Sequence, residues 1–437
     1  MKVLKFGGTS VGTAERMKNV TELVRSRGKN IIVLSAMSGT TNTLVEISDY
    51  LYKKNLTGAK ETINLLENKY KQTIDELFSS EEYKTEAKKA IAERFDFIRS
   101  FNKPVFTLFE EKEILAQGEL MSTALLYNYM LEQNMNVVLL PAFEFMRTDK
   151  NAEPDTHYIK EKLGTLLKNH PDADFYLTQG YICRNAYGEI DNLQRGGSDY
   201  TASLIGAAVK AEEIEIWTDI DGMHNNDPRF VEGTKPVSEL HFEEAAELAY
   251  FGAKILHPTC VLPAKLNNIP VRLLNTMQPD AAGTLIYNTK STNKIKAVAA
   301  KDNITAIKIK SSRMLLAYGF LRKVFEIFET HRTSIDMIVT SEVGVSVTVD
   351  NERNLPAILE DLKKFGTVTI DKDMVIICVV GDLEWQNRGF EAEVVNALKD
   401  IPIRMISYGG SNYNISLLVR KQDKIKALNL LSERIFD

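Results

Sequence analysis

Residues that mark several special classes of protein are scarce in this chain of 437 residues. It contains three cysteines, two tryptophans and six histidines. Cys183, Cys260 and Cys378 lie far apart, form no CxxC pair and have no histidine at metal-ligand spacing. A disulfide framework and a structural zinc site are therefore excluded, and no metal-ligating residue is expected. We interpret each cysteine as a small buried hydrophobic residue in a protein from a reducing compartment.

Long apolar runs and a basic excess are also missing. The longest apolar stretches, such as residues 31–34 and 137–140, fall far short of the roughly 18 residues that a membrane helix needs. Lys5 and neighbouring glycines interrupt the N-terminal segment, unlike a signal peptide. The 54 Lys and Arg residues are outnumbered by 59 Asp and Glu residues, giving a net charge of −5. These features predict a cytoplasmic protein that binds neither a membrane nor nucleic acid.

The remaining composition is that of a globular protein, and the length suits about three domains. A strand over residues 3–6, a glycine turn and a helix over residues 14–27 are followed by a strand at 31–34. Strands and helices alternate in this way over the first 290 residues, which predicts an α/β domain with a mostly parallel sheet. The charged residues 57–99 carry apolar positions three and four apart and are expected to form inserted amphipathic helices.

The C-terminal third contains an internal duplication. After an expected linker at 290–300, the predicted order is strand (305–309), helix (320–330), strands (335–340 and 343–349), helix (355–364) and strand (367–370). A second series has strands at 374–380, 403–407 and 415–419 and helices at 390–398 and 424–435. The expected domains are therefore 1–290, 301–372 and 373–437, the last two being βαββαβ units. The last strand of the second unit is either missing or supplied from elsewhere.

Two glycine-containing clusters carry residues suited to binding anions. Lys5-Phe6-Gly7-Gly8-Thr9-Ser10 places a cation, glycine amides and hydroxyls at a strand-to-helix turn, where phosphate binds readily. It is not a Walker A loop, because the chain contains no GxxxxGK[ST]. Arg195-Gly196-Gly197-Ser198-Asp199 combines a guanidinium suited to a carboxylate with an acid that could position a metal-bound phosphate or a lysine. Taken alone, each cluster could also be an ordinary turn before a helix.

Two further segments could contact a nucleotide. Thr218-Asp219-Ile220-Asp221-Gly222 follows a strand and precedes Asp227-Pro228-Arg229, and Lys254 lies in the segment FGAKILHP at residues 251–258. Each segment could equally be a polar loop, and His257 within the second is interpreted as structural. Together the four segments supply the amides, lysines, arginine and acid that phosphoryl transfer between two anionic reactants requires.

The motifs KFGGTS, GELMST (118–123), RGGSDYTA (195–202), WTDIDG (217–222), DPR (227–229) and FGAKILHP resemble those of the aspartate kinases in order and spacing. The duplicated tail is similar to the paired ACT regulatory domains of that family. The resemblance implies an amino-acid-kinase-type αβα sandwich followed by two ferredoxin-like ACT units. It favours the monofunctional, lysine-sensitive type, and because the chain ends after the second unit we expect no fused homoserine dehydrogenase.

The resemblance also implies a reaction and its residues. Such an enzyme transfers the γ-phosphoryl of ATP, with Mg²⁺ carried on the ATP phosphates, to the side-chain carboxylate of L-aspartate. The product is 4-phospho-L-aspartate, the entry to lysine, threonine and methionine biosynthesis. The implied catalytic residues are Lys5 and Asp199, and the implied aspartate-binding residues are Thr41, Glu119, Arg195 and Ser198. The implied ATP-binding residues are Lys5, Gly7, Gly8, Ser10, Thr218, Asp219, Arg229, Lys254 and Ile255.

Feedback inhibition through the first ACT unit, with L-lysine as effector, is implied as well. The corresponding residues are Met314, Gly319, Phe320, Leu321, Ser334, Ile335, Asp336, Thr340, Ser341 and Glu342. A homodimer or dimer of dimers through the ACT units is expected. Two positions depart from the family pattern: His224 stands where many relatives have tyrosine, and Ala317 where lysine-sensitive relatives usually have serine.

Two alternatives remain open. One is another amino-acid kinase, acting on glutamate, acetylglutamate or UMP, although Glu119 and the RGGSD segment favour aspartate. The other is a catalytically silent amino-acid sensor, in which the ACT pair binds an effector and the first 290 residues are a relic. The presence of Lys5, Glu119, Arg195 and Asp199 speaks against the sensor.

Overall fold

The computed structural model describes residues 1–103, 105–193, 196–252, 256–289, 294–311 and 318–436. The chain divides into two compact units, Met1–Met223 with Ile255–Asn288 and His224–Lys254 with Thr289–Asp437. Residues 224–254 thus group with the C-terminal residues. The division into domains 1–290, 301–372 and 373–437 stays a prediction. No helix in the described part of the chain has the length and apolarity to cross a membrane. The three cysteines are buried, as expected.

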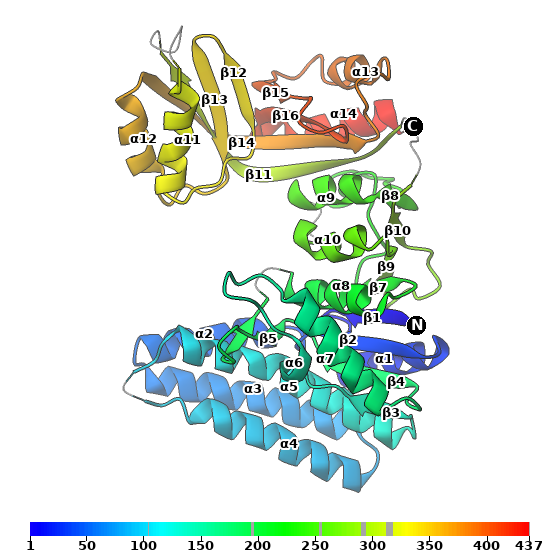
Figure 1. Ribbon diagram of the computed structural model, residues 1–437. Coiled ribbons are helices and arrows are strands. Elements are labelled where there is room, and N and C mark those ends of the chain that lie inside the picture. Colours follow the sequence, from blue (N-terminus) through cyan, green and yellow to red (C-terminus); the bar gives the residue numbers. More distant parts are fainter. Residues whose placement is uncertain (104, 194–195, 253–255, 290–293, 312–317, 437) are drawn as a thin grey trace. The chain divides into compact units, whose positions relative to one another are not determined.

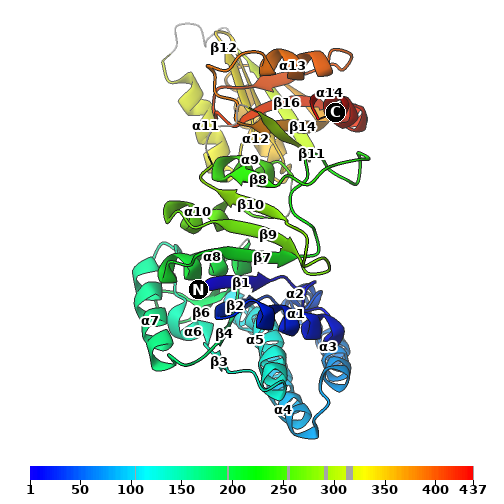
Figure 2. The same ribbon diagram turned by 90° about the vertical axis from the view of Figure 1, so that its right-hand side faces the viewer.

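The first unit is built on a twisted sheet in which the strands lie in the order β3-β4-β2-β1-β7-β9-β10 (Figure 2). The strands are β1 (Lys2–Phe6), β2 (Asn30–Leu34), β3 (Val137–Leu139), β4 (Phe175–Gln179), β7 (Ile214–Thr218), β9 (Val271–Asn275) and β10 (Thr284–Tyr287). Neighbouring strands are parallel except for β9 and β10. The mostly parallel sheet predicted from the sequence is therefore confirmed. A separate hairpin joins β5 (Ile182–Arg184) to β6 (Ile190–Asn192).

Helices cover both faces of this sheet. They are α1 (Ala14–Ser26), α2 (Thr40–Tyr52), α3 (Leu56–Leu77), α4 (Glu81–Arg99), α5 (Leu108–Glu132), α6 (Ala142–Phe145), α7 (Thr156–Asn169), α8 (Gly197–Val209) and α10 (Pro258–Leu266). Successive side chains of β1 point to opposite faces. Leu4 and Phe6 join the core cluster that includes residues of α1, α3 and α5, whereas Lys5 reaches Asp199 of α8.

The predicted amphipathic helices over residues 57–99 are α3 and α4, which lie alongside α5 (Figure 1). The buried face of α3 carries Ala59, Ile63, Leu66 and Tyr70, at the three- and four-residue spacing of one helix face. The start of α5 is fixed by a capping box between Thr107 and Glu110. This helix matters for the site because it carries Glu119.

The second unit contains one antiparallel sheet in the order β12-β13-β11-β14-β16-β15, in which β11 and β14 are long strands lying side by side (Figure 1). The strands of this sheet are β11 (Ile295–Lys310), β12 (Ile338–Ser341), β13 (Gly344–Val349), β14 (Thr367–Gly381), β15 (Met405–Ser407) and β16 (Asn414–Arg420). The second unit also contains the short strand β8 (Glu239–His241), which is not part of this sheet. The helices of the second unit are α9 (Phe242–Tyr250), α11 (Phe320–Thr330), α12 (Leu355–Lys363), α13 (Phe390–Ala397), α14 (Lys424–Ile435) and the short 3-10 turn Lys421–Asp423.

The linker expected at 290–300 is wrong from Ile295 onward, because β11 begins there. Apolar residues of 295–301 pair with β14 over residues 376–381, while 304–310 pair with 367–374. The first half of β11 therefore supplies the strand that the second βαββαβ unit lacks in sequence. Likewise, β14 joins the strands predicted separately at 367–370 and 374–380. The linker was predicted from the Asn and Ser residues before 294, and its predicted end at residue 300 lies inside β11.

Candidate active site

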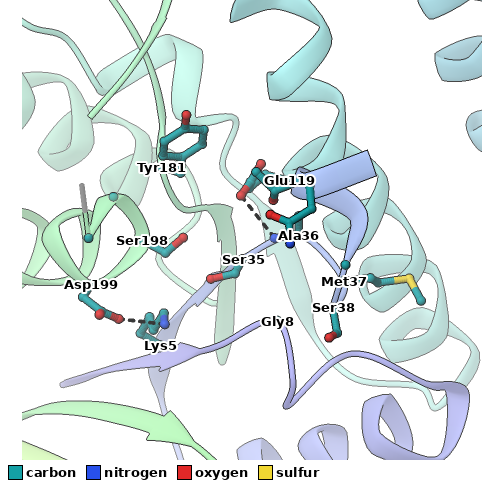
Figure 3. Close-up of a pocket in the computed structure, with 15 residues that line it drawn as sticks. Lys5, Gly8, Ser35, Ala36, Met37, Ser38, Glu119, Tyr181, Ser198 and Asp199 are labelled. Atoms are coloured by element: carbon teal, nitrogen blue, oxygen red, sulfur yellow. Dashed lines mark hydrogen bonds and ion pairs between the residues drawn. The ribbon is translucent and has the colours of Figure 1, made fainter. Parts of the chain in front are cut away.

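A cavity of about 460 Å³ lies at the carboxyl ends of β1, β2 and β4, the edge where open parallel sheets bind ligands (Figure 3). Its size is that of a small-molecule site. It is lined by Lys5, Gly8, Ser35, Ala36, Met37, Ser38, Gly39, Thr41, Asn42, Glu119, Tyr181, Gly196, Gly197, Ser198 and Asp199. The lining thus comes from segments that are far apart in the sequence.

A nearly buried ion pair stands on one side of the cavity. The Lys5 ammonium lies 2.7 Å from Oδ1 of Asp199, and the two side chains are only 9% and 15% exposed (Figure 3). Lys5 is held by the central strand β1, and Asp199 by the first turn of α8. Burial keeps such a pair from being screened by salt and fixes its geometry. A positive charge is therefore presented to the cavity at a defined position.

Two helices begin at the cavity without a side-chain cap. Gly39 precedes α2 with φ of +79°, Gly196 precedes α8 with φ of +72°, and neither helix start receives a side-chain hydrogen bond. The first N–H groups of a helix have no partner inside it and carry partial positive charge. Uncapped helix starts next to Lys5 therefore suit anionic groups such as phosphates and carboxylates.

Glycines let the backbone segments around the cavity approach closely. A Cβ on Gly8 would lie 2.7 Å from the Ala36 carbonyl oxygen, and one on Gly197 would lie 2.3 Å from Cδ2 of Tyr181. Larger residues at either position would push these segments apart. The glycine pairs seen in the sequence thus serve close packing as well as amide exposure.

Glu119 is the acid of an otherwise anion-binding cavity. Gly118 brings α5 close to the loop after β2, since a Cβ there would lie 2.9 Å from Cβ of Ala36. The Ala36 N–H donates to Oε1 of Glu119 over 3.2 Å (Figure 3), while Oε2 is buried without a partner among the described residues. Burial raises the pKa of Glu119 to about 8, against the opposing effect of the Lys5 charge. A cation entering the cavity would supply the missing partner.

The structure brings six of the predicted catalytic, aspartate-binding and ATP-binding residues into this cavity: Lys5, Gly8, Thr41, Glu119, Ser198 and Asp199. Other predicted residues are engaged elsewhere. The Gly7 N–H donates to the Trp217 carbonyl over 3.1 Å, so this amide is already occupied. Ser10 is buried with its hydroxyl 2.9 Å from that of Thr276.

The remaining predicted nucleotide residues are divided between the two units. Thr218 accepts the Ile220 N–H within a turn of the first unit, and Asp219 is exposed beside it. Arg229 belongs to the second unit, where it lies 2.6 Å from Asp227 and is 67% exposed. Arg195, Lys254 and Ile255 lie outside the described residues. His224, the departure from the family pattern, is 3.0 Å from the Thr234 hydroxyl.

Sequence reasoning missed Tyr181 and most of the segment that follows β2. Tyr181 has φ of +65°, rare for a residue with a side chain, and its N–H donates to the Thr201 hydroxyl over 3.0 Å. Burial and the Glu119 charge raise the pKa of its hydroxyl. Its position directly after Gly180, which follows the buried parallel strand β4, was an available signal. Residues 35–42 likewise follow a buried parallel strand, β2, but Thr41 is the one residue among them that the sequence predicted for the site.

The predicted effector residues lie around α11 and the β12–β13 hairpin. Gly319, Phe320 and Leu321 form the start of α11, Ser334 and Ile335 precede Asp336, and Thr340, Ser341 and Glu342 lie at the hairpin turn. Met314 lies outside the described residues. Asp336 donates its N–H to the Thr348 carbonyl at the far end of the hairpin. Asp336 and Glu342 are thus separated by the length of β12, roughly 15 to 20 Å.

No group of three or more His, Cys, Asp or Glu side chains in the described ranges is arranged to hold a metal ion. Of the acids that line the cavity, Asp199 is paired with Lys5, and Glu119 accepts the Ala36 N–H at Oε1 only.

Comparisons with known proteins agree with this geometry. Residues 1–275 match the amino acid kinase family, and residues 377–435 match an ACT domain. The lysine-sensitive aspartokinase 3 of Escherichia coli K12 is 32% identical over all of this chain and 99% of its own length. The chloroplastic aspartokinase 3 of Arabidopsis thaliana is 34% identical over all of this chain and 81% of its own length.

Solved structures show the same similarity. E. coli aspartokinase III in complex with aspartate and ADP superposes with a TM-score of 0.86 at 32% identity, with both chains fully covered. The aspartate kinase of Clostridium acetobutylicum gives a TM-score of 0.86 at 25% identity, again over both whole chains. The amino acid kinase fold and the C-terminal ACT region predicted from the sequence are confirmed. The chain belongs to the aspartokinases, the ATP-dependent kinases of aspartate.

Proposed function

We propose that the protein transfers the γ-phosphoryl of ATP to the side-chain carboxylate of L-aspartate, giving 4-phospho-L-aspartate for lysine, threonine and methionine biosynthesis. One observation carries this proposal: a single cavity combines anion-binding groups with a buried carboxylate, Glu119, that has an unpartnered oxygen. L-Aspartate presents two carboxylates and one ammonium, which fits this combination. The E. coli relative that has been solved with aspartate and ADP supports it.

The residues divide into three roles. Lys5, aligned by Asp199, and the starts of α2 and α8 neutralise charge where the two anionic reactants meet. Glu119 holds the substrate ammonium. Thr41, Ser198 and Arg195 hold the carboxylates of the substrate. The proposed ATP-binding residues are Lys5, Gly7, Gly8, Ser10, Thr218, Asp219, Arg229, Lys254 and Ile255. The Gly7 N–H is not expected to contact ATP, because it already donates to the Trp217 carbonyl.

The transfer itself needs no general base. An aspartate side chain, with an ordinary pKa of about 3.9, is already ionised at neutral pH. One of its oxygens bonds to the γ-phosphorus while the bond from that phosphorus to the bridging oxygen of ADP breaks, and no proton moves. Mg²⁺ on the ATP phosphates would withdraw charge from them. The task of this chain is therefore to position the reactants and offset their repulsion.

The direct test is an assay of the full chain with ATP, Mg²⁺ and L-aspartate, in which hydroxylamine traps the acyl phosphate as a hydroxamate. We expect product with L-aspartate and little with L-glutamate or N-acetylglutamate, because the longer side chain places its carboxylate beyond the aligned position. Product with glutamate or acetylglutamate alone would establish the other amino-acid kinase. Nucleotide binding without any product would favour the silent sensor.

We propose L-lysine as the feedback effector of the first ACT unit. The support is the acidic character of Asp336 and Glu342, together with the E. coli relative solved with lysine and aspartate. In the same assay, L-lysine is expected to suppress hydroxamate formation while L-threonine leaves it unchanged. If L-threonine alone suppresses hydroxamate formation, L-threonine is the effector in place of L-lysine, and the proposed reaction is unaffected.

We also propose a homodimer, or a dimer of dimers, through the ACT units. The edge strand β12 exposes Ile338, and the neighbouring turn exposes Val343 at 50%. An uncovered edge with apolar side chains is suited to pairing with a second copy. Such pairing would also offer acids from two copies to one effector, since Asp336 and Glu342 lie at opposite ends of the hairpin. Sedimentation of the purified chain as a monomer at micromolar concentration would contradict this.

The KM for aspartate is expected to depend on pH through Glu119. The substrate ammonium needs the ionised carboxylate, but a pKa of about 8 keeps Glu119 protonated at lower pH. Binding below that pH must therefore release a proton, so KM should fall as the pH rises, approaching tenfold per unit, and level off above about pH 8. Initial rates between pH 6 and 9 test this. Glu119→Gln should abolish the slope, and a slope that survives the change would belong to another group.

A further inference from the structure

The loop after β2, residues 35–39, lines the cavity over its whole length (Figure 3). One side of this loop is held by the first strand and the turn that follows it. The Ser35 N–H donates to the Phe6 carbonyl over 3.1 Å, and the Ser38 N–H donates to the Gly8 carbonyl over 3.0 Å. The loop is therefore fixed on this side to the turn that carries the proposed phosphate-binding residues.

The other side of the loop is held by α3, one of the inserted helices. The Lys69 ammonium donates to the Ser38 carbonyl over 2.6 Å. The Tyr70 hydroxyl lies 3.2 Å from the hydroxyl of Thr40, the first residue of α2, and both side chains are buried. Hydrogen bonds from a charged donor are stronger than those between neutral groups. Two consecutive residues of α3, neither of which lines the cavity, thus hold the place where α2 begins.

The end of this loop has little to restrain it by itself. Gly39 carries no side chain, has a left-handed φ of +79°, and leaves the start of α2 without a side-chain cap. Glycine loses more backbone freedom on ordering than any other residue, so the position of the loop depends on contacts from outside. The Lys69 ammonium lies 4.0 Å from the position that a Cβ on Gly39 would take. The contact from α3 therefore falls where the loop turns into the helix.

The position of the α2 start bears on two of the proposed aspartate-binding residues. Thr41, which lines the cavity, directly follows Thr40. Thr40 also packs against α5, since its Cγ2 lies 3.5 Å from the position of a Cβ on Gly118, the residue before Glu119. Tyr70, Thr40 and Gly118 therefore join α3 to α5. The separation of the Thr41 hydroxyl from the Glu119 carboxylate, which are proposed to bind opposite charges of one substrate, depends on these contacts.

We infer that Lys69 and Tyr70 are positioning residues of the active site, which hold the loop after β2 and the start of α2 in the arrangement that receives L-aspartate. This inference rests on the proposed function and adds the inserted helix α3 to the elements that build the site. Groups that are ordered before the substrate arrives lower the cost of binding, and small displacements of such groups reduce turnover. Without the contacts from α3, the substrate itself has to order the loop.

Lys69→Met in the full chain tests the inference, because it keeps most of the side-chain volume and removes the donor to the Ser38 carbonyl. Hydroxamate formation should show a kcat/KM for aspartate that is at least about tenfold lower, mainly through KM, which is the size expected for one hydrogen bond from a charged group. Lys69→Arg can still donate to the carbonyl and should stay within about threefold of wild type. Tyr70→Phe loses a neutral hydrogen bond, and its kcat/KM should fall about threefold.

Hydrogen exchange of the backbone amides of residues 35–42 gives a second readout, which needs no substrate. In the unliganded Lys69→Met variant these amides should exchange at least about tenfold faster than in wild type, since a local opening becomes easier when a charged hydrogen bond is lost. Saturating L-aspartate should reduce this difference, because the bound substrate orders the loop.

Lys71→Met is the matched control, because Lys71 lies on the same helix, where its ammonium is 2.9 Å from Glu67 and its side chain is 54% exposed. It should keep the wild-type KM and exchange rates, and equal changes in both variants would show general loosening of α3 and overturn the inference. In Lys69→Met, a raised KM without faster exchange would mean direct contact with the substrate, and faster exchange without a raised KM would mean a purely structural contact; either result overturns the inference. Absence of hydroxamate from wild-type protein would overturn the proposed function, whereas equal exchange in wild type and Lys69→Met would overturn this inference alone.

Discussion

Replacing Lys5 with methionine is expected to lower kcat by at least about a hundredfold. The substitution keeps most of the side-chain volume but removes the only charge that faces Asp199 at 2.7 Å in the described cavity. The Asp199 carboxylate would then add its own repulsion to that between ATP and aspartate. Losing one preorganised group that stabilises transition-state charge typically costs a factor of about 100 to 1,000. Hydroxamate formation at saturating substrates measures the effect.

Lys2→Met is the matched control for this variant. Lys2 lies on the same strand, where its ammonium contacts Glu213 at 3.0 Å and Glu215 at 2.8 Å, at the end of β1 remote from the cavity. It should leave kcat near the wild-type value even if thermal unfolding shifts. Near-normal turnover of the Lys5 variant, or an equal loss in both variants, would remove Lys5 from the catalytic residues.

Glu119→Gln is expected to raise the KM for aspartate by roughly ten- to a hundredfold with a smaller change in kcat. The amide keeps the shape of the side chain and can still accept the Ala36 N–H, but it cannot offer a charge to the substrate ammonium. A hydrogen bond to a charged group contributes about 1.5 to 3 kcal/mol, which gives a change of this size. Initial rates against aspartate concentration at pH 8 separate KM from kcat.

Glu113→Gln on the same helix provides the comparison, since Glu113 does not line the cavity. Its KM for aspartate should match wild type. An unchanged KM in the Glu119 variant would take Glu119 out of the substrate site. A fall in kcat with constant KM would instead assign it to the positioning of Lys5 or the loop after β2.

Much of the site could be predicted because its residues follow one another closely in motifs. Lys5 and Gly8 sit in one strand-to-helix turn, and Ser198 and Asp199 in another, so their spacing implied a common edge of the sheet. Tyr181 could not be found this way. The Tyr181 backbone is left-handed, and Gly197, sixteen positions later in the sequence, leaves room for the Tyr181 ring.

The regulatory half shows a different limit. The helices and strands of the two βαββαβ units follow their apolar patterns closely, but the pattern of 295–301 gives no sign of the partner strand at 376–381. The partners of Asp336 are equally remote, since Tyr250 and Lys301 come from other elements. A sequence pattern reports which face of an element is buried, and long-range pairing decides what buries it.

The shared strands β11 and β14 bear on how this half of the chain can fold and be divided. Because Val298 pairs with Val379, the second βαββαβ unit is completed only after the whole of the first has been synthesised between its strands. Contacts of such long sequence separation slow folding, since a large loop must close before they form. A fragment that starts at residue 373 would lack an inner partner for β14 and expose that edge to aggregation. The two βαββαβ units therefore have to be kept together. Exchange of regulatory domains between relatives should succeed only when the junction lies before residue 295, so that the whole of β11 is transferred with them.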